Sequence, residues 1–320
     1  MSFKILGTGS CLPQRSVTNE DLSELLDTSD EWITQRVGIS ERRICTTETT
    51  TDLSVGAATG ALEMSNTSPG DLDLILCATV SADHTAPSLA CSVQNRLGAT
   101  CPAMDINAAC SGFIYMLETA AGFFALGYKR ILVIGAERLT RLVDWTDRST
   151  AVIFADGAGA MVLAPGSSYI TSKLVAKGGD SVLRIPSFSG ESPFYENEAQ
   201  KPYIYMNGQE VFKFAVNAMC TDLADVVEAA GLTMDDIAWV IPHQANARII
   251  DFAVKKFGIK PERCLKNIEK TGNTSAASVA ILADELIRSG KLKDGDYIAM
   301  AAFGAGLTSA ACVIQWKVEN

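Results

Sequence analysis

The chain has 320 residues, of which 48% are hydrophobic and 20% charged, and its formal net charge at pH 7 is −10. This length suffices for one large domain or two related halves, and the acidic balance argues against nucleic acid as a main partner. No stretch is apolar over the length of a membrane span, and the first residues lack the pattern of a signal peptide. The nine cysteines form no CxxC pair or disulfide framework. We therefore expect a cytoplasmic protein without a membrane partner.

Strands and helices alternate along the first half of the chain. The pattern predicts a strand over 3–9 that runs into a glycine turn, a capped helix from Asp30, a helix over 52–65, a strand over 72–80, a helix over 88–97, a strand over 130–135 and a strand pair around a tight Gly-Ala-Gly turn within 154–163. The GxG at Gly7 lacks the third glycine of a dinucleotide fingerprint, and Pro13 interrupts the helix that such a site needs.

The central stretch of this half is Pro102–Gly122. A short strand turns at Asn107 and becomes a long helix that begins near Cys110. The helix is apolar on nearly every side, which predicts that it is buried in the middle of a large domain. A cysteine at a helix N-terminus lies where unpaired N–H groups favour a thiolate, although many cysteines are merely small core residues.

The second half repeats the order of the first. Strands over 172–179 and 236–241, a helix opened by Gly272–Ser275 and an apolar strand that leads from a Gly-Ala-Gly turn to Trp316 follow one another. A repeat of this length indicates a duplicated domain with layered α/β structure and largely parallel sheets. We place the halves at 1–168 and 169–320, with 184–210 as an inserted cap over a pocket.

Three polar residues at loop-to-helix corners form a candidate active site. His243 follows a buried strand at the turn into a helix over 247–257, where ligand sites gather in α/β sheets. Asn273 is either an N-cap or an amide donor that faces a carbonyl group. Together with Cys110 they suit nucleophilic catalysis, and a cysteine hydrolase fits these residues equally well. Trp32 with nearby arginines suits a nucleotide-bearing molecule such as coenzyme A, or else a solvated basic helix end.

Six separated motifs extend this pattern over essentially the whole chain. They are Asp30–Ile33 with Arg36–Ile39 and Glu41–Arg43, Asp105–Phe113, Asp144–Arg148, Asp156–Ala160, His243–Asn246 and Gly272–Ser278. In these motifs the chain resembles the β-ketoacyl-[acyl-carrier-protein] synthase III family. The resemblance implies a thiolase-like fold of two duplicated halves in α-β-α-β-α layers, and a homodimer. It also implies the decarboxylative condensation of an acyl-CoA primer with malonyl-acyl carrier protein, which initiates fatty acid synthesis.

The resemblance also assigns roles to single residues. Cys110 would be the acylated nucleophile, and His243 and Asn273 would serve the decarboxylative step. The backbone N–H groups of Cys110 and Ala305 would form an oxyanion hole, with alanine where the family often has glycine. The coenzyme A site would consist of Trp32 and Arg148 around the adenine, and of Arg36 and Asn246 along the pantetheine tunnel. No metal ion or redox cofactor is implied, because acyl-CoA is a substrate.

Two further sets follow from the resemblance. The carrier protein would contact Lys213, Gln244, Arg248, Lys255 and Lys256, although a solvated helix face explains the last two lysines as well. The acyl pocket would contain Ala86, Leu142 and Phe303. Ala86 stands where the family often has a bulky residue that reaches into the partner's acyl pocket, so we expect room for a longer or branched primer.

The motifs discriminate among several related classes of protein. A second active-site histidine or a second cysteine, as in elongating condensing enzymes and degradative thiolases, has no counterpart in the matching motifs. A secondary-metabolite acyltransferase that uses another acceptor would keep the same three catalytic residues. A non-catalytic partner subunit would be expected to lose the cysteine.

Overall fold

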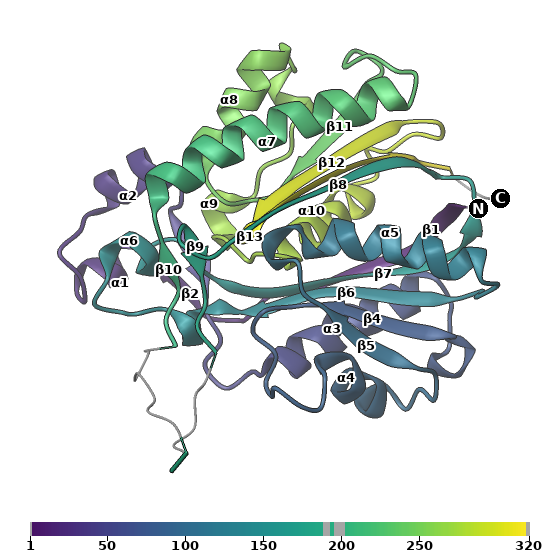
Figure 1. Ribbon diagram of the computed structural model, residues 1–320, viewed down its shortest axis with the longest axis horizontal. Coiled ribbons are helices and arrows are strands. Elements are labelled where there is room, and N and C mark those ends of the chain that lie inside the picture. The colour runs from purple at the N-terminus through teal and green to yellow at the C-terminus, as the bar shows by residue number, and fades with distance from the viewer. Residues whose placement is uncertain (1, 188–192, 195–201, 318–320) are drawn as a thin grey trace.

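The computed structural model describes residues 2–187, 193–194 and 202–317 (Figure 1). The first half forms a five-stranded sheet in the order β1-β7-β6-β4-β5. Its strands are β1 (Ser2–Cys11), β4 (Leu74–Ala78), β5 (Ala103–Ile106), β6 (Ile131–Arg138) and β7 (Asp156–Gly166). β7 pairs antiparallel with both β1 and β6, whereas β4 pairs parallel with both β6 and β5.

The second half forms a four-stranded sheet in the order β11-β12-β13-β8. Its strands are β8 (Tyr169–Gly179), β11 (Ile237–Pro242), β12 (Tyr297–Gly304) and β13 (Gly306–Gln315). β8, β13, β12 and β11 match β1, β7, β6 and β4 in both order and direction. This match confirms the duplicated α/β architecture. The expectation of largely parallel sheets is wrong, because β7 and β13 each pair antiparallel with both of their neighbours. The boundary at residue 168, between β7 and β8, stays a prediction.

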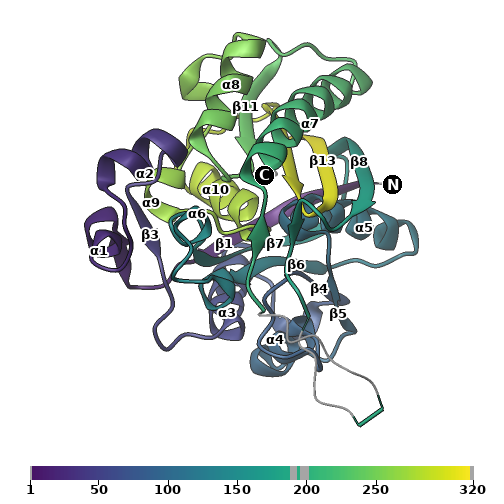
Figure 2. The same cartoon turned by 60° about the vertical axis from the view of Figure 1, so that its left-hand side comes forward.

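Helices cover both sheets and fill the space between them (Figures 1 and 2). The outer helices are α3 (Thr50–Met64) and α4 (Leu89–Leu97) on the first sheet, and α7 (Gly208–Ala229) and α8 (Ala247–Phe257) on the second. The inner helices are α5 (Gly112–Ala125) and α10 (Ala277–Arg288), whose apolar side chains form one buried cluster with residues of both sheets. The layers therefore run α-β-α-β-α.

Short elements complete the fold, and several of them contribute residues to the cavities described below. They are β2 (Ser16–Thr18), β3 (Glu41–Arg43), β9 (Leu183–Arg184), β10 (Tyr205–Met206), α1 (Asn19–Ser23), α2 (Asp30–Val37), α6 (Arg148–Ala151), α9 (Ile268–Thr271) and the 3-10 turns η1 (Pro69–Asp71), η2 (Ala109–Ser111), η3 (Leu139–Leu142) and η4 (Pro261–Arg263). The Ser29 hydroxyl caps α2, which ends at Gly38 with φ 77°. No helix of the described ranges has the length and apolarity to cross a membrane.

Two glycine turns predicted from the sequence are wrong. Gly7 and Gly9 lie inside β1, and Gly157 and Gly159 lie inside β7, which is one continuous strand. A Cβ at Gly9 would come within 2.2 Å of a carbonyl oxygen of α3, and one at Gly159 within 2.6 Å of Ala280 on α10. These glycines are required because a helix packs directly against the strand.

Candidate active site

Two cavities meet at Cys110. The larger, of about 900 Å³, is lined by Cys110, His243 and Asn273 together with residues of α2, α7 and α8. The smaller, of about 510 Å³, is lined by Cys110 and Ser275 and by mostly apolar residues of β9 and the loops around it. The three residues predicted to be catalytic therefore come together. Of the predicted cap over 184–210, residues 188–192 and 195–201 lie outside the described residues, whereas Met206 and Asn207 line the larger cavity.

Cys110 lies in the 3-10 turn η2, two residues before α5 begins at Gly112. The preceding Ala109 has φ 46°, a left-handed conformation that is uncommon for alanine. Cys110 is half-buried and lines both cavities, and desolvation raises the pKa of its thiol to about 12. Desolvation therefore opposes the thiolate that the helix N-terminus was expected to stabilise. Cys110 needs a proton acceptor to react.

His243 follows β11 and is 1% exposed. Its Nδ1 lies 2.7 Å from the Ser278 hydroxyl, whose oxygen also faces the Gln244 N–H at 3.4 Å. When the Ser278 hydroxyl donates to Nδ1, the ring proton lies on Nε2. Burial lowers the pKa of His243 to about 3, so the imidazole is neutral. A neutral ring with a proton on Nε2 is a hydrogen-bond donor.

Asn273 precedes α10 and is tied to the loop before β7. Its backbone N–H donates to Ile153 at 3.0 Å, and its carbonyl accepts from Ala155 at 2.9 Å. The side-chain Oδ1 accepts from the Ser275 N–H at 2.8 Å, so the amide both caps a turn and fixes its own orientation. The Nδ2 group is then the part of the side chain that can donate to a ligand.

The tip of the β12–β13 hairpin packs against Cys110. A Cβ at Gly304 would lie 2.6 Å from the Cys110 nitrogen, and Ala305 lines the smaller cavity beside Cys110. Ala305 is absent from the non-glycine residues with positive φ, so alanine is tolerated at this turn. The assignment of the Cys110 and Ala305 N–H groups to an oxyanion hole stays a prediction.

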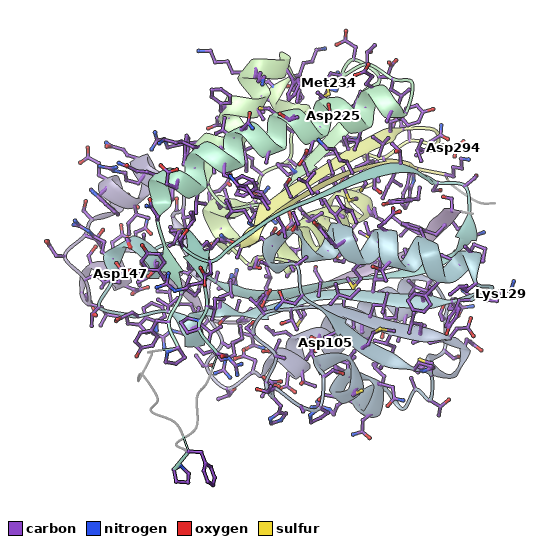
Figure 3. The ribbon with its side chains drawn as sticks, in the orientation of Figure 1. Asp105, Lys129, Asp147, Asp225, Met234 and Asp294 are labelled. Atoms are coloured by element: carbon purple, nitrogen blue, oxygen red, sulfur yellow. The ribbon has the colours of Figure 1, made fainter. Side chains whose placement is uncertain are left out.

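The predicted coenzyme A residues lie at one mouth of the larger cavity. The Arg148 guanidinium lies 4.6 Å from the centre of the Trp32 ring, and that of Arg36 lies 5.5 Å from it. Asp147 caps α6 by accepting a hydrogen bond from the Ser149 N–H. Figure 3 shows Asp147 at the left of the molecule, where Figure 1 places both α6 and α2. The Asn246 amide donates to the Arg36 carbonyl at 3.1 Å and so connects α2 to α8. An aromatic ring and basic side chains therefore lie together at this entrance to the larger cavity.

The predicted acyl-pocket residues are not brought together. Phe303 lines the larger cavity, and its ring lies 5.3 Å from that of His243. Leu142 lines neither cavity itself but packs in the same cluster as Leu139 and Ile204 of the smaller cavity, so its assignment stays a prediction. Ala86 is exposed in the single chain, where it also lines neither cavity. Its predicted position in a partner's pocket stays a prediction.

The predicted carrier-protein residues lie in three different environments. Lys213 and Arg248 line the larger cavity, and Lys255 and Lys256 are exposed at the end of α8. Gln244 is fully buried: its amide donates to the Pro242 carbonyl at 2.7 Å and accepts from two backbone N–H groups of the loop that leads into α9. Its assignment to the carrier-protein surface is wrong, because both ends of the side chain are used to hold the loop.

Three polar residues near Cys110 were missed. Glu137 is the penultimate residue of β6 and is 0% exposed, Ser275 precedes α10, and Ser278 lies in its first turn. The sequence carried a signal for Glu137, since it is the first charged residue after the apolar run Ile131–Ala136. Both serines belong to the Gly272–Ser278 motif, although no role was assigned to them. The described ranges contain no group of three or more His, Cys, Asp or Glu residues that could hold a metal ion.

Comparisons with known proteins agree with this geometry. The family model for 3-oxoacyl-[acyl-carrier-protein (ACP)] synthase III matches residues 104–178, and that for its C-terminal part matches residues 227–316. Beta-ketoacyl-[acyl-carrier-protein] synthase III of Clostridium acetobutylicum is 46% identical over 321 residues, which cover 98% of this chain and 99% of that relative. The crystal structure of 3-oxoacyl-[acyl-carrier-protein] synthase III from Aquifex aeolicus VF5 has a TM-score of 0.92 at 45% identity and covers 98% of this chain and 100% of its own.

A priming β-ketosynthase from the R1128 polyketide biosynthetic pathway has the same TM-score of 0.92 at 35% identity, and covers 99% of this chain and 96% of its own. The fold is thus shared by primary and specialised enzymes. The match over nearly the full length to relatives at 45–46% identity decides the family. This chain belongs to the β-ketoacyl-[acyl-carrier-protein] synthase III family.

Proposed function

We propose that this protein condenses an acyl-CoA primer with malonyl-acyl carrier protein to give β-ketoacyl-acyl carrier protein, CoA and CO2. The observation that carries the proposal is the meeting of Cys110, His243 and Asn273 in one cavity whose mouth holds Trp32 and basic side chains. Family membership supports the same reaction, because the relatives are named for it. The chemistry balances without a metal ion or redox cofactor, since acyl-CoA is consumed as a substrate.

In the first half-reaction, the Cys110 sulfur attacks the thioester carbonyl of acyl-CoA and the CoA sulfur leaves. The backbone N–H groups of Cys110 and Ala305 donate to the oxyanion of the tetrahedral intermediate. The adenine of coenzyme A would displace Arg148 from the Trp32 face and stack between the two side chains, because both present flat surfaces. The acyl chain would extend into the smaller cavity beyond Cys110, which is lined mostly by apolar groups.

In the second half-reaction, malonyl-acyl carrier protein loses CO2 and leaves an enolate. The neutral His243 Nε2–H and the Asn273 Nδ2 group donate to the enolate oxygen. The enolate carbon attacks the acyl-Cys110 carbonyl, and the Cys110 sulfur leaves. A neutral imidazole suits this role because it donates a hydrogen bond without transferring its proton.

The remaining partners are part of the same proposal. Exposed Lys255 and Lys256, with Arg248 at the cavity, would attract an acidic carrier protein despite the negative charge of the whole chain. We propose a cytoplasmic homodimer in which exposed Ala86 reaches the partner's acyl pocket, where its small side chain leaves room for a longer or branched primer.

The reaction is tested by incubating the protein with an acyl-CoA and malonyl-acyl carrier protein, followed by intact-mass analysis of the carrier protein. A carrier thioester that has lost CO2 and gained the acyl group supports the proposal, with Cys110→Ala as the inactive control. Release of free acid instead would identify a hydrolase. An acyl group moved only to an acceptor other than the carrier thioester would favour the specialised acyltransferase.

A further inference from the structure

A buried acid lies close to the nucleophile. Glu137 is 0% exposed at the end of β6. Its Oε2 accepts from the Val80 N–H at 3.1 Å, from Thr79 Oγ1 at 3.3 Å and from the Ser81 hydroxyl. Among the described residues its Oε1 receives only the shared Val80 N–H, at 3.3 Å, so this oxygen keeps the capacity to accept another hydrogen bond.

Ser275 connects this acid to Cys110. Its hydroxyl is buried and has no partner at full hydrogen-bond geometry among the described residues. Ser275 lines the smaller cavity together with Cys110, and its hydroxyl lies close enough to the Cys110 thiol and the Glu137 carboxyl to lower the pKa of each. Its backbone has φ 47°, a conformation that is rare for serine and is characteristic of residues held for function. An unpaired buried hydroxyl between an acid and a thiol is a natural bridge for a proton.

We propose that Ser275 and Glu137 form a proton relay for Cys110, in which Glu137 is the general base. This inference rests on the proposed acylation of Cys110. As the sulfur attacks the thioester, the S–H bond breaks, its proton passes to the Ser275 oxygen, and the Ser275 proton passes to the Glu137 carboxylate. The CoA thiolate takes its proton from solvent. When the enolate later displaces the Cys110 sulfur, Glu137 returns the proton along the same path.

The charges around the relay fit this role. Burial raises the pKa of Glu137 to about 7, so the carboxyl can accept and release a proton near neutral pH. Cys110 is the titratable group that faces it from the turn before α5, and its thiol pKa of about 12 creates the need for a base. Arg138 and Asp156 are paired in the strand register one position further along β6, and alternation along the strand directs Arg138 to the other face of the sheet.

The relay is tested by the pH dependence of Cys110 alkylation with iodoacetamide, a small uncharged probe, read by peptide mass spectrometry from pH 5.5 to 9.5. For the wild type we expect a rate that rises through about pH 7, as Glu137 ionises, and then levels off. Glu137→Gln and Ser275→Gly should lose this inflection and react about 10-fold to 100-fold more slowly at pH 7.5. The double variant should be no slower than the slower single variant, because both changes break one path.

The controls separate a relay from a structural or purely electrostatic role. Ser275→Gly removes the hydroxyl while suiting the positive φ, and Asn66→Gly, at φ 49° far from the site, controls for the backbone change. Exposed Cys91 is an internal reference whose profile should stay the same in all variants. If Glu137 acted only as a negative charge, its removal would speed alkylation at neutral pH. Faster reaction, or an unchanged inflection in both variants, overturns the relay.

A second measurement on the same protein samples distinguishes failure of the relay from failure of the proposed function. Uptake of an acyl group from acyl-CoA by the wild type is measured in parallel. If the wild type takes up no acyl group, the proposed function fails while the alkylation profile still reports on the relay. If Glu137→Gln does not fold, Ser275→Gly decides the outcome alone.

Discussion

The two halves of the molecule share one scaffold but present opposite chemistry at its centre. α5 and α10 both lie between the sheets, and both begin next to Cys110. In the first half, the penultimate residue of β6 is buried Glu137, and the turn before α5 carries the thiol. In the second half, the matching strand β12 ends in Phe303 and Gly304, and the polar groups are a neutral imidazole and an amide. In the proposed reaction the first half supplies the thiol and the acid, whereas the second half supplies uncharged hydrogen-bond donors and Ser275, the bridging hydroxyl of the proposed relay.

Removing the hydrogen-bond donors of the second half tests this comparison most strongly. We expect His243→Ala and Asn273→Ala each to slow decarboxylation of malonyl-acyl carrier protein by about 10²–10³, because each removes one donor from a developing oxyanion. Acylation of Cys110 should change by less than about tenfold. The two half-reactions are measured separately, as CO2 release and as acyl-enzyme mass. Equal losses in both steps would show that the division of labour between the halves is wrong.

Burial of Glu137 should also make the free energy of unfolding depend on pH. The pKa of Glu137 rises from an ordinary 4.5 to about 7 on folding, so the folded state binds the proton more tightly between these values. Its contribution to stability is therefore lost as pH rises through this window. Glu137→Gln avoids that loss, so its stability relative to wild type should grow by about 3 kcal/mol from pH 4.5 to pH 8. Urea unfolding at both pH values measures it. A difference independent of pH would mean that Glu137 is already ionised in the folded protein.

The contact between the halves gives the smallest expected effect. Gly159→Ala places a methyl group 2.6 Å from Ala280 and from the Ile281 nitrogen of α10, which should lower the free energy of unfolding by about 1–3 kcal/mol. Gly122→Ala is the matched control, because it lies exposed in α5 with nothing within 4 Å and should raise stability by about 0.5–1 kcal/mol. If both variants have the same stability, β7 and α10 are not packed as closely as described.

Local sequence patterns predicted helix boundaries well where residues of the helix itself and its cap determine where it begins and ends. The helix over 247–257 matches α8 at both ends, and α4 ends at Leu97 before Gly98, which has φ 72°. The glycine turns at Gly9 and Gly159 were wrong because a strand glycine required by a helix from elsewhere in the chain looks like a turn in the sequence. Tertiary packing, which the local pattern does not contain, decided these positions.

The same limit applies to the site. Cys110, His243 and Asn273 were predicted together because strand ends and helix starts gather at one edge of the sheets. Gln244 was misplaced because a polar residue next to His243 gives no sign in the sequence of which way it faces. Glu137 was missed because the cost and the use of burying an acid depend on partners from three other segments: Thr79–Ser81, Ser275 and Cys110.

The most direct test of the proposed function is whether Cys110 carries the acyl group. Wild type and Cys110→Ala would be exposed to acetyl-, isobutyryl-, hexanoyl- and octanoyl-CoA and examined by intact-protein mass spectrometry. We predict one acyl adduct on the wild type, none on the variant, and loss of the adduct when malonyl-acyl carrier protein is added. The donor that reacts fastest also tests whether Ala86 leaves room for a longer primer. Absence of an adduct with every donor, or an adduct that persists in Cys110→Ala, would contradict the proposed function.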